Sequence, residues 1–237
     1  MKTESIMAMA ATVLVVLAIM ATYGFTARDV IIGGVLAAWV LFVVFYLSKI
    51  VAKYTNKYVS RKFIHFTTAG LVTLLIYFTL LQGDLIFSSP SIPVGAAFVL
   101  ALITLVPHLE EKELTWFQVK NNFGEVWFCI SWGILFLTFW YVDLIIPVIA
   151  TFFMAFGDGV TGIVRNYVYK KWTKGIWGSV AMLAISAPFG AFVAGVQGFL
   201  SAVLATIVEK MPWIDDNLTV PLVSAVILYL LRYVVIF

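Results

Sequence analysis

A polar stretch between Gly157 and Ser179 interrupts an otherwise apolar chain. Its polar and small residues include Gly157, Asp158, Gly159, Gly162, Arg165, Lys170, Lys171, Lys174, Gly178 and Ser179. Glycines let a phosphate approach the backbone closely, an aspartate can hold Mg²⁺ between nucleotide oxygens, and cations neutralise phosphate charge. These residue types indicate a site for a nucleotide phosphate with its metal ion. Helix capping by Asp158 and close helix packing at the glycines are the structural alternatives.

A second group of ionisable residues is Arg61-Lys62-Phe63-Ile64-His65, at the expected start of an apolar helix. In a helix, residues three and four apart are neighbours, so Arg61, Lys62 and His65 can share one face. Two cations beside a potential proton acceptor suit phosphate oxygens. The alternative is that Arg61 and Lys62 are anchors whose charged ends reach the membrane surface.

Acidic residues gather again before the last apolar run, where Asp215, Asp216 and Asn217 follow Glu209. They could ligate a metal ion or cap the helix that starts near Val220. Among the remaining acids, Glu125 is a further candidate because it lies just inside an apolar run. Glu110 and Glu111 are typical of a solvated loop, and His108 of a membrane interface.

The elements that must position these residues are membrane helices. The chain has 237 residues, of which 63% are hydrophobic and 11% charged, against about 25% charged in soluble domains. Long apolar runs recur without the alternation typical of barrel strands. The composition predicts an all-α, polytopic integral membrane helical bundle. With one cysteine, Cys129, the chain cannot form an intramolecular disulfide.

About nine transmembrane helices are expected, at 5–25, 30–49, 63–82, 92–107, 123–141, 144–157, 177–194, 196–209 and 219–236. The run 177–209 is too long for one crossing and contains Pro188, Gly190, Gly195, Gln197 and Gly198. These residues break helices, so two short helices joined by a tight turn are predicted there. Asp158 and Asp216 can share a metal ion only if this segment crosses the membrane twice.

The distribution of positive charge sets the predicted orientation. In this arrangement all of the 15 Lys and Arg residues except Arg28 and Arg232 lie on one side, which the positive-inside rule makes the cytoplasm. The N-terminus is then cytoplasmic, and all three polar groups reach the same cytoplasmic boundary. A transporter more often places ionisable residues in mid-span. The arrangement favours chemistry at the place where a water-soluble molecule meets a membrane-embedded one.

Taken in order, these motifs resemble the CTP-dependent lipid kinases: dolichol kinase, phytol kinase and the yeast-type diacylglycerol kinase. The matching segments are Arg61–His65, Gly157–Gly159, Lys174–Ser179 and Asp215–Leu222, which cover about residues 60–225. One departure is Val-Thr-Gly after the Gly-Asp segment, where the family often has a Gly-Arg ending. The resemblance divides the chain into N-terminal transmembrane helices at 1–58 and a membrane-embedded kinase core at 59–237.

The resemblance implies transfer of the γ-phosphate of CTP to an isoprenoid alcohol of dolichol, polyprenol, geranylgeraniol or phytol type. The products are CDP and a polyprenyl phosphate, made at the cytoplasmic face of a prokaryotic or archaeal cell membrane. In this hypothesis Asp158 and Asp216, with Asp215, hold Mg²⁺, and His65 or one aspartate accepts the hydroxyl proton. The expected triphosphate contacts are Arg61, Lys62, Arg165, Lys171 and Lys174, with hydrogen bonds from Ser179 and Asn217.

The main alternative is a phosphatidate-type cytidylyltransferase, which needs a similar site and makes a CDP-activated lipid. A small membrane transporter fits less well because few polar residues lie in mid-span. CDP-alcohol phosphotransferases need further aspartates at four-residue steps after the Asp-Gly pair, whereas the next acid here is Glu209. The expected partners are CTP, the isoprenoid alcohol and the lipid bilayer, with no nucleic acid. A homodimer is compatible with the sequence.

Overall fold

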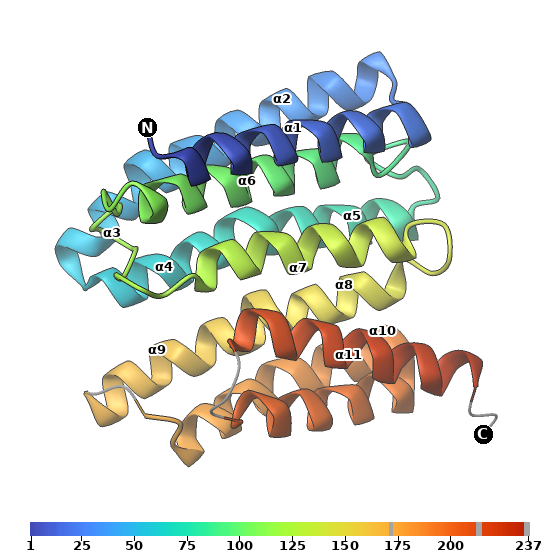
Figure 1. Cartoon of the computed structure of the whole chain (residues 1–237). Coiled ribbons are helices and arrows are strands. Elements are labelled where there is room, and N and C mark those ends of the chain that lie inside the picture. The colour runs from blue at the N-terminus through green and yellow to red at the C-terminus, as the bar shows by residue number, and fades with distance from the viewer. Residues whose placement is uncertain (171–172, 212–214, 235–237) are drawn as a thin grey trace.

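The computed structural model describes residues 1–170, 173–211 and 215–234. It is all-α, and its described residues form eight continuous helical stretches arranged side by side (Figure 1). The predicted all-α fold class is confirmed.

Three of the described stretches contain a π-helical turn, labelled η. The elements in the first half are α1 (Thr3–Tyr23), α2 (Ala27–Phe42), η1 (Val43–Leu47), α3 (Ser48–Tyr54), α4 (Lys57–His65), η2 (Phe66–Gly70), α5 (Leu71–Leu81) and α6 (Ser91–Leu109). The elements in the second half are α7 (Gly124–Phe139), α8 (Ile145–Phe152), η3 (Phe153–Gly157), α9 (Asp158–Tyr169), α10 (Ile176–Glu209) and α11 (Asp216–Tyr233).

Capping residues fix where the helices begin. The side chain of Asn56 accepts hydrogen bonds from the backbone N–H groups of Tyr58 and Val59, both at 3.0 Å, and so starts α4 at Lys57. An asparagine in this position satisfies helix N–H groups that have no partner within the helix. The helix therefore starts before the predicted residue 63. As a result, Arg61 and Lys62 lie inside a helix and are buried.

Two π-helical turns adjoin the polar groups singled out in the sequence. The turn η2 follows His65 directly, and η3 ends at Gly157, immediately before Asp158. The rings of Phe66 in η2 and Phe156 in η3 stack with their centroids 5.5 Å apart. Such turns are rare and often occur at functional sites. Here they pack against each other between α4 and α5 on one side and α8 and α9 on the other.

The helix α10 is broken in the middle, as the sequence predicts. Ala194 and Gly195 leave the helical conformation, and Gly195 has a φ of +57°. A straight helix of 34 residues would be about 51 Å long, and residues eight apart would be separated by about 12 Å. Instead the backbones of Gly190 and Gly198 are in contact, so that a Cβ on either would overlap the other's carbonyl group. The two halves of α10 therefore fold back on each other.

The outer surface of the bundle is apolar. Among the described residues, six helices are long and apolar enough to cross a membrane: Thr3–Tyr23, Ala27–Tyr54, Lys57–Leu81, Ser91–Leu109, Ile145–Tyr169 and Ile176–Glu209. Large side chains such as Leu14, Ile31 and Phe192 are exposed on them. Soluble monomers rarely expose so much contiguous apolar surface. The protein is a multi-pass membrane protein.

Candidate active site at one end of the bundle

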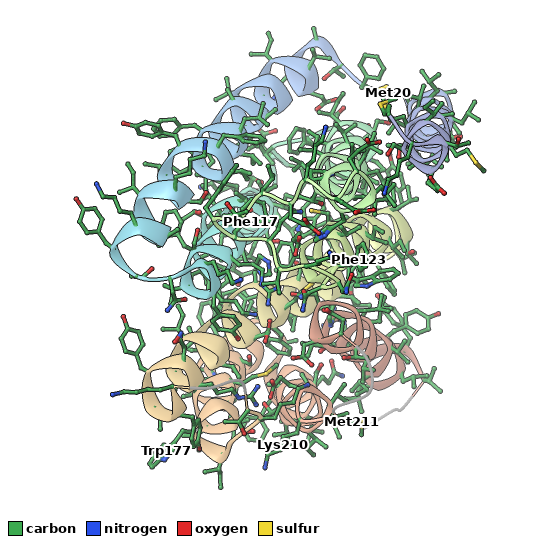
Figure 2. All side chains as sticks on the ribbon, turned by 60° about the vertical axis from the view of Figure 1, so that its left-hand side comes forward. Met20, Phe117, Phe123, Trp177, Lys210 and Met211 are labelled. Atoms are coloured by element: carbon green, nitrogen blue, oxygen red, sulfur yellow. The ribbon has the colours of Figure 1, made fainter. Side chains whose placement is uncertain are left out.

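A polar cavity of about 690 Å³ lies at the end of the bundle that carries the α3–α4 turn and the end of α9. Figure 2 turns this end forward and shows polar side chains inside the bundle as well as on its surface. The charged residues that line the cavity are Lys57, Arg61, Lys62, Asp158, Arg165, Lys170, Lys174, Asp215 and Asp216. Six of these nine described side chains are cations and three are carboxylates. The cavity is therefore suited to an anionic ligand.

Three carboxylates converge at this end from segments that are distant in the sequence. Asp158 starts α9, Glu209 ends α10 and Asp216 starts α11, and one oxygen of each lies within 4.8 Å of the other two. Asp158 is 3% exposed and Glu209 is fully buried. The fold-back of α10 explains the meeting, because it returns Glu209 to the end of the bundle where α10 began.

Each of these carboxylates is paired with a cation. Lys62 Nζ lies 2.5 Å from Asp158 Oδ2, and Lys174 Nζ lies 2.6 Å from Asp216 Oδ1. Arg165 donates from Nη1 and Nη2 to the two oxygens of Glu209, at 2.5 and 2.7 Å. Removing charges from water costs several kcal/mol per ion, and pairing offsets this cost only in part. Such a concentration of buried charge is more typical of a functional site than of a structural core.

The donor set fits a small divalent cation. Mg²⁺ prefers carboxylate and carbonyl oxygens and is usually bound by one or two carboxylates together with substrate phosphates. Asn217 adds an amide oxygen that has no hydrogen-bond partner in the described structure, although its side chain is only 4% exposed and lines the cavity. Asp158 and Asp216 are the carboxylates that both line the cavity and belong to the cluster.

Glycine allows the two charged helices to approach. A Cβ at Gly162 of α9 would lie 2.8 Å from Cε of Lys62, which real Cβ atoms essentially never do. The side chains of Tyr58 and Lys62 on α4 therefore lie directly against the backbone of α9 at position 162, which carries no side chain. This close approach is the packing role that the sequence left open for the glycines, and it serves the charged site.

Some of the residues that the sequence predicted for the site lie at the polar cavity, and others do not. Asp215 lines the cavity, but it caps α11 through the Asn217 backbone N–H at 2.9 Å and lies outside the three-carboxylate cluster. Ser179 is in the first turn of α10 and is not among the residues that line the cavity. Lys171 lies outside the described residues. The remaining residues expected at the triphosphate, Arg61, Lys62, Arg165, Lys174 and Asn217, all line it.

His65 does not accompany Lys62 into the polar cavity. Its ring stacks on Phe128 with the centroids 3.9 Å apart, and it is 1% exposed. Neither ring nitrogen has a hydrogen-bond partner among the described residues. Although Lys62 and His65 are three residues apart on α4, they line different cavities.

A second buried polar cluster lies beside Arg61. Arg61 donates to the side-chain oxygen of Asn122 at 2.8 Å and lies 3.9 Å from Glu125. Glu125 in turn is 2.8 Å from Nε2 of His108. The sequence singled out Glu125 as unusual and expected His108 at a membrane interface, but it did not pair the two residues. Both are buried, and the pair joins the end of α6 to the start of α7.

Glu209 belongs to the three-carboxylate cluster, and the sequence analysis did not include it among the candidate site residues. One signal was available: it is the first acid after Asp158 and it ends an apolar run. Its partnership with Arg165 could not be read from spacing, since the two residues are on different helices. By contrast, Glu110 and Glu111 are peripheral, as expected. Ser5 donates a hydrogen bond to Glu110, which lowers the pKa of that carboxyl below its usual value.

Comparison with known proteins adds no assignment. No protein-family model, curated protein or solved structure matches the chain. The case for a function therefore depends on the site geometry and on the motifs described above.

Lys174 allows a direct test of nucleotide binding at the polar cavity. Its ammonium donates to the Glu209 and Met211 carbonyl oxygens, at 2.7 and 2.8 Å, and to Asp216. Lys174→Met removes a cation from the cavity wall. On the hypothesis, implied by the resemblance, that CTP binds here, we expect its binding to weaken about 10- to 100-fold, equivalent to ~1.4–2.8 kcal/mol. Equilibrium binding of labelled CTP measures this. The matched control is Lys112→Met, at an exposed lysine between α6 and α7, which should bind CTP normally. Equal affinity in both variants would place the nucleotide elsewhere.

Proposed function

We propose that the protein is a membrane kinase that transfers the γ-phosphate of CTP to the hydroxyl of an isoprenoid alcohol. One observation carries the proposal: three segments far apart in the sequence line a single cavity rich in cations. The first contributes Arg61 and Lys62, the second Asp158, Arg165 and Lys174, and the third Asp216 and Asn217. A nucleoside triphosphate keeps a net negative charge when Mg²⁺ is bound, so it complements a wall with twice as many cations as carboxylates.

The proposed topology has nine crossings, with the N-terminus in the cytoplasm. It counts α10 as two crossings and includes α7 and α11. Two crossings by α10 are supported by the position of its termini. Both lie at the end of the bundle that carries the polar cavity and the N-terminus of the chain (Figure 1). The active site then lies at the cytoplasmic face, where CTP is available and where a lipid headgroup can reach the same depth.

The chemistry requires alignment and charge neutralisation more than covalent participation by the protein. Lys62 and Arg165 are already held by their carboxylate partners, so they can face triphosphate oxygens without much loss of side-chain freedom. Lys174, whose three N–H groups all have acceptors within the protein, contributes its positive charge to the cavity wall. Asp158 and Asp216 are the carboxylates that would hold Mg²⁺, which would supply positive charge to offset that of the phosphates. Lys62, Asp158 and Arg165 are buried, which strengthens their electrostatic interactions with a bound triphosphate.

The preference for CTP and for an isoprenoid acceptor rests on the resemblance of the four sequence segments. The test is an assay of the purified protein with CTP and ATP, each labelled on the γ-phosphate, against polyprenols, diacylglycerol and phosphatidate. We expect label from CTP on the prenol, with at least about tenfold less from ATP, a difference of ~1.4 kcal/mol. Transfer from ATP alone would exclude CTP as the donor.

The alternative function is a cytidylyltransferase that makes a CDP-activated lipid from phosphatidate. The same cavity would serve it, since that reaction also starts from CTP with a metal ion. Label in the cytidine part of CTP separates the two reactions. Its appearance in the lipid fraction would overturn the kinase proposal, whereas its retention in CDP supports it.

A further inference from the structure

A second cavity, of about 210 Å³, lies between α2, α4, η2, α6 and α7. Its walls are mainly aliphatic and aromatic side chains, among them Val40, Ala96 and Trp132. Ala37 and Leu41 of α2 also line it and are themselves exposed. The cavity therefore opens on the outer face of the bundle, which in a membrane is covered by lipid. A cavity of this kind suits a hydrocarbon chain that enters from the bilayer.

The inner end of this cavity is polar. Arg61, His65 and Glu125 line it, and all three are buried. Polar atoms on each lack a hydrogen-bond partner in the described structure: Arg61 Nε, Glu125 Oε2, and both ring nitrogens of His65. Buried polar atoms that lack a partner cost about 1–3 kcal/mol each. A hydroxyl group, which donates one hydrogen bond and accepts others, can pair with a carboxylate and with a cation or imidazole at once.

Arg61 connects this cavity to the charged one. It is the only described residue that lines both the polar cavity and the apolar cavity. Its guanidinium group reaches Asn122 at the polar cavity, while Glu125 lies 3.9 Å away on the apolar side. A hydroxyl at the inner end of the apolar cavity would therefore lie next to the site proposed for the triphosphate.

We propose that the apolar cavity binds the acceptor lipid, with its hydrocarbon chain between α2 and α6 and its hydroxyl at Arg61, His65 and Glu125. This inference rests on the proposed function, because only that function makes the bound lipid a phosphate acceptor. The position of the lipid site is argued from the cavity alone. It places the acceptor on the opposite side of Arg61 from the nucleotide. It also assigns His65 and Glu125 to positioning the alcohol rather than to the metal ion or the triphosphate.

The experiment uses the full-length protein in detergent micelles and a long-chain prenol that carries a photoreactive diazirine. After irradiation, mass spectrometry of peptides should find the label on α2, α6 and α7. Ala37→Phe should lower labelling about tenfold by filling the cavity, and Ala96→Phe repeats the test from α6 if the new ring at position 37 turns outward. The matched control is Ala38→Phe, since Ala38 is exposed on the same helix and does not line the cavity.

Competition tests the polar end of the cavity. An unlabelled prenol should displace the probe at least about tenfold better than a hydrocarbon of the same length without a hydroxyl group, because only the alcohol pairs with the buried polar atoms. Equal competition would remove the hydroxyl site from the proposal. Label confined to α10 or α11, or unchanged in both Phe variants, would overturn the lipid cavity altogether.

The outcomes also separate this inference from the proposed function. Specific labelling of the cavity without phosphate transfer from any nucleotide would leave the lipid site in place and reject the kinase. Phosphate transfer with label elsewhere would support the kinase and reject this site.

Discussion

Asp158→Asn should abolish phosphate transfer while leaving the bundle folded. Asp158 lines the polar cavity, belongs to the three-carboxylate cluster and has its Oδ2 bound by Lys62. An asparagine keeps the size and one acceptor oxygen but loses the negative charge that would hold Mg²⁺. We expect kcat/KM to fall by about 10³-fold or more, or ~4 kcal/mol of transition-state stabilisation. A γ-phosphate transfer assay on the purified variant measures the effect.

The Asp158→Asn substitution also leaves the charge of Lys62 without its partner. This should reduce stability, so folding needs its own control. Removing one partner of a buried ion pair leaves the other charge unpaired and lowers the free energy of unfolding by about 3–5 kcal/mol. The double variant Asp158→Asn, Lys62→Met removes both charges and should recover much of the thermal stability without recovering activity. Asp143→Asn is the matched substitution at the other end of the bundle, where Asp143 pairs with Arg232 at 2.7 Å, and it should stay active. Near-normal turnover in folded Asp158→Asn would remove Asp158 from the metal site.

Gly198→Ala should destabilise the protein and lower its activity at the same time. The new Cβ would overlap the carbonyl oxygen of Gly190, which is backbone and cannot turn away. The two halves of α10 must then separate, and Glu209 at the end of the second half moves relative to Arg165. Overpacking of this kind costs typically 1–3 kcal/mol, and for a chain of this size ~3 kcal/mol corresponds to roughly 6–12 °C in apparent Tm. Thermal unfolding in detergent, followed by tryptophan fluorescence, measures it.

The control for this substitution is Gly34→Ala on α2. A Cβ at Gly34 has no other atom within 4 Å, so the change should leave the Tm unchanged or slightly raised, because alanine favours a helix more than glycine does. If Gly198→Ala were as stable as Gly34→Ala, the close contact between the halves of α10 would be wrong. The return of Glu209 to Asp158 would then lose its explanation.

Much of the fold could be predicted from the sequence because a membrane leaves few choices. Apolar runs without alternation require helices, since each backbone polar group must be satisfied within its own segment. Pro188 and the glycines around Gly195 located the break in α10, because residues that disrupt helices act locally. The start of α4 was placed too late, although Asn56, the residue that caps it, is a local signal as well.

The candidate site was predictable only in part. Composition singled out Arg61, Lys62, Asp158, Arg165, Lys174 and Asp216, because charge in a membrane protein is costly and stands out against apolar residues. Asp215 and Asp216 looked equivalent in the sequence. The structure distinguishes them, since one turns back to cap α11 and the other faces Lys174.

The sequence by itself determined that this is a helical membrane protein whose charged residues occur in a few compact segments. Only the tertiary structure decided how those charges pair: Lys62 with Asp158, Arg165 with Glu209 and Lys174 with Asp216. It also decided that Lys62 and His65, three residues apart, line different cavities. The physical reason is that composition and periodicity act within a segment, whereas pairing depends on how helices rotate and pack against one another. The contacts at Gly162 and between Gly190 and Gly198 set that packing, and they become visible only when the neighbouring helix is in place.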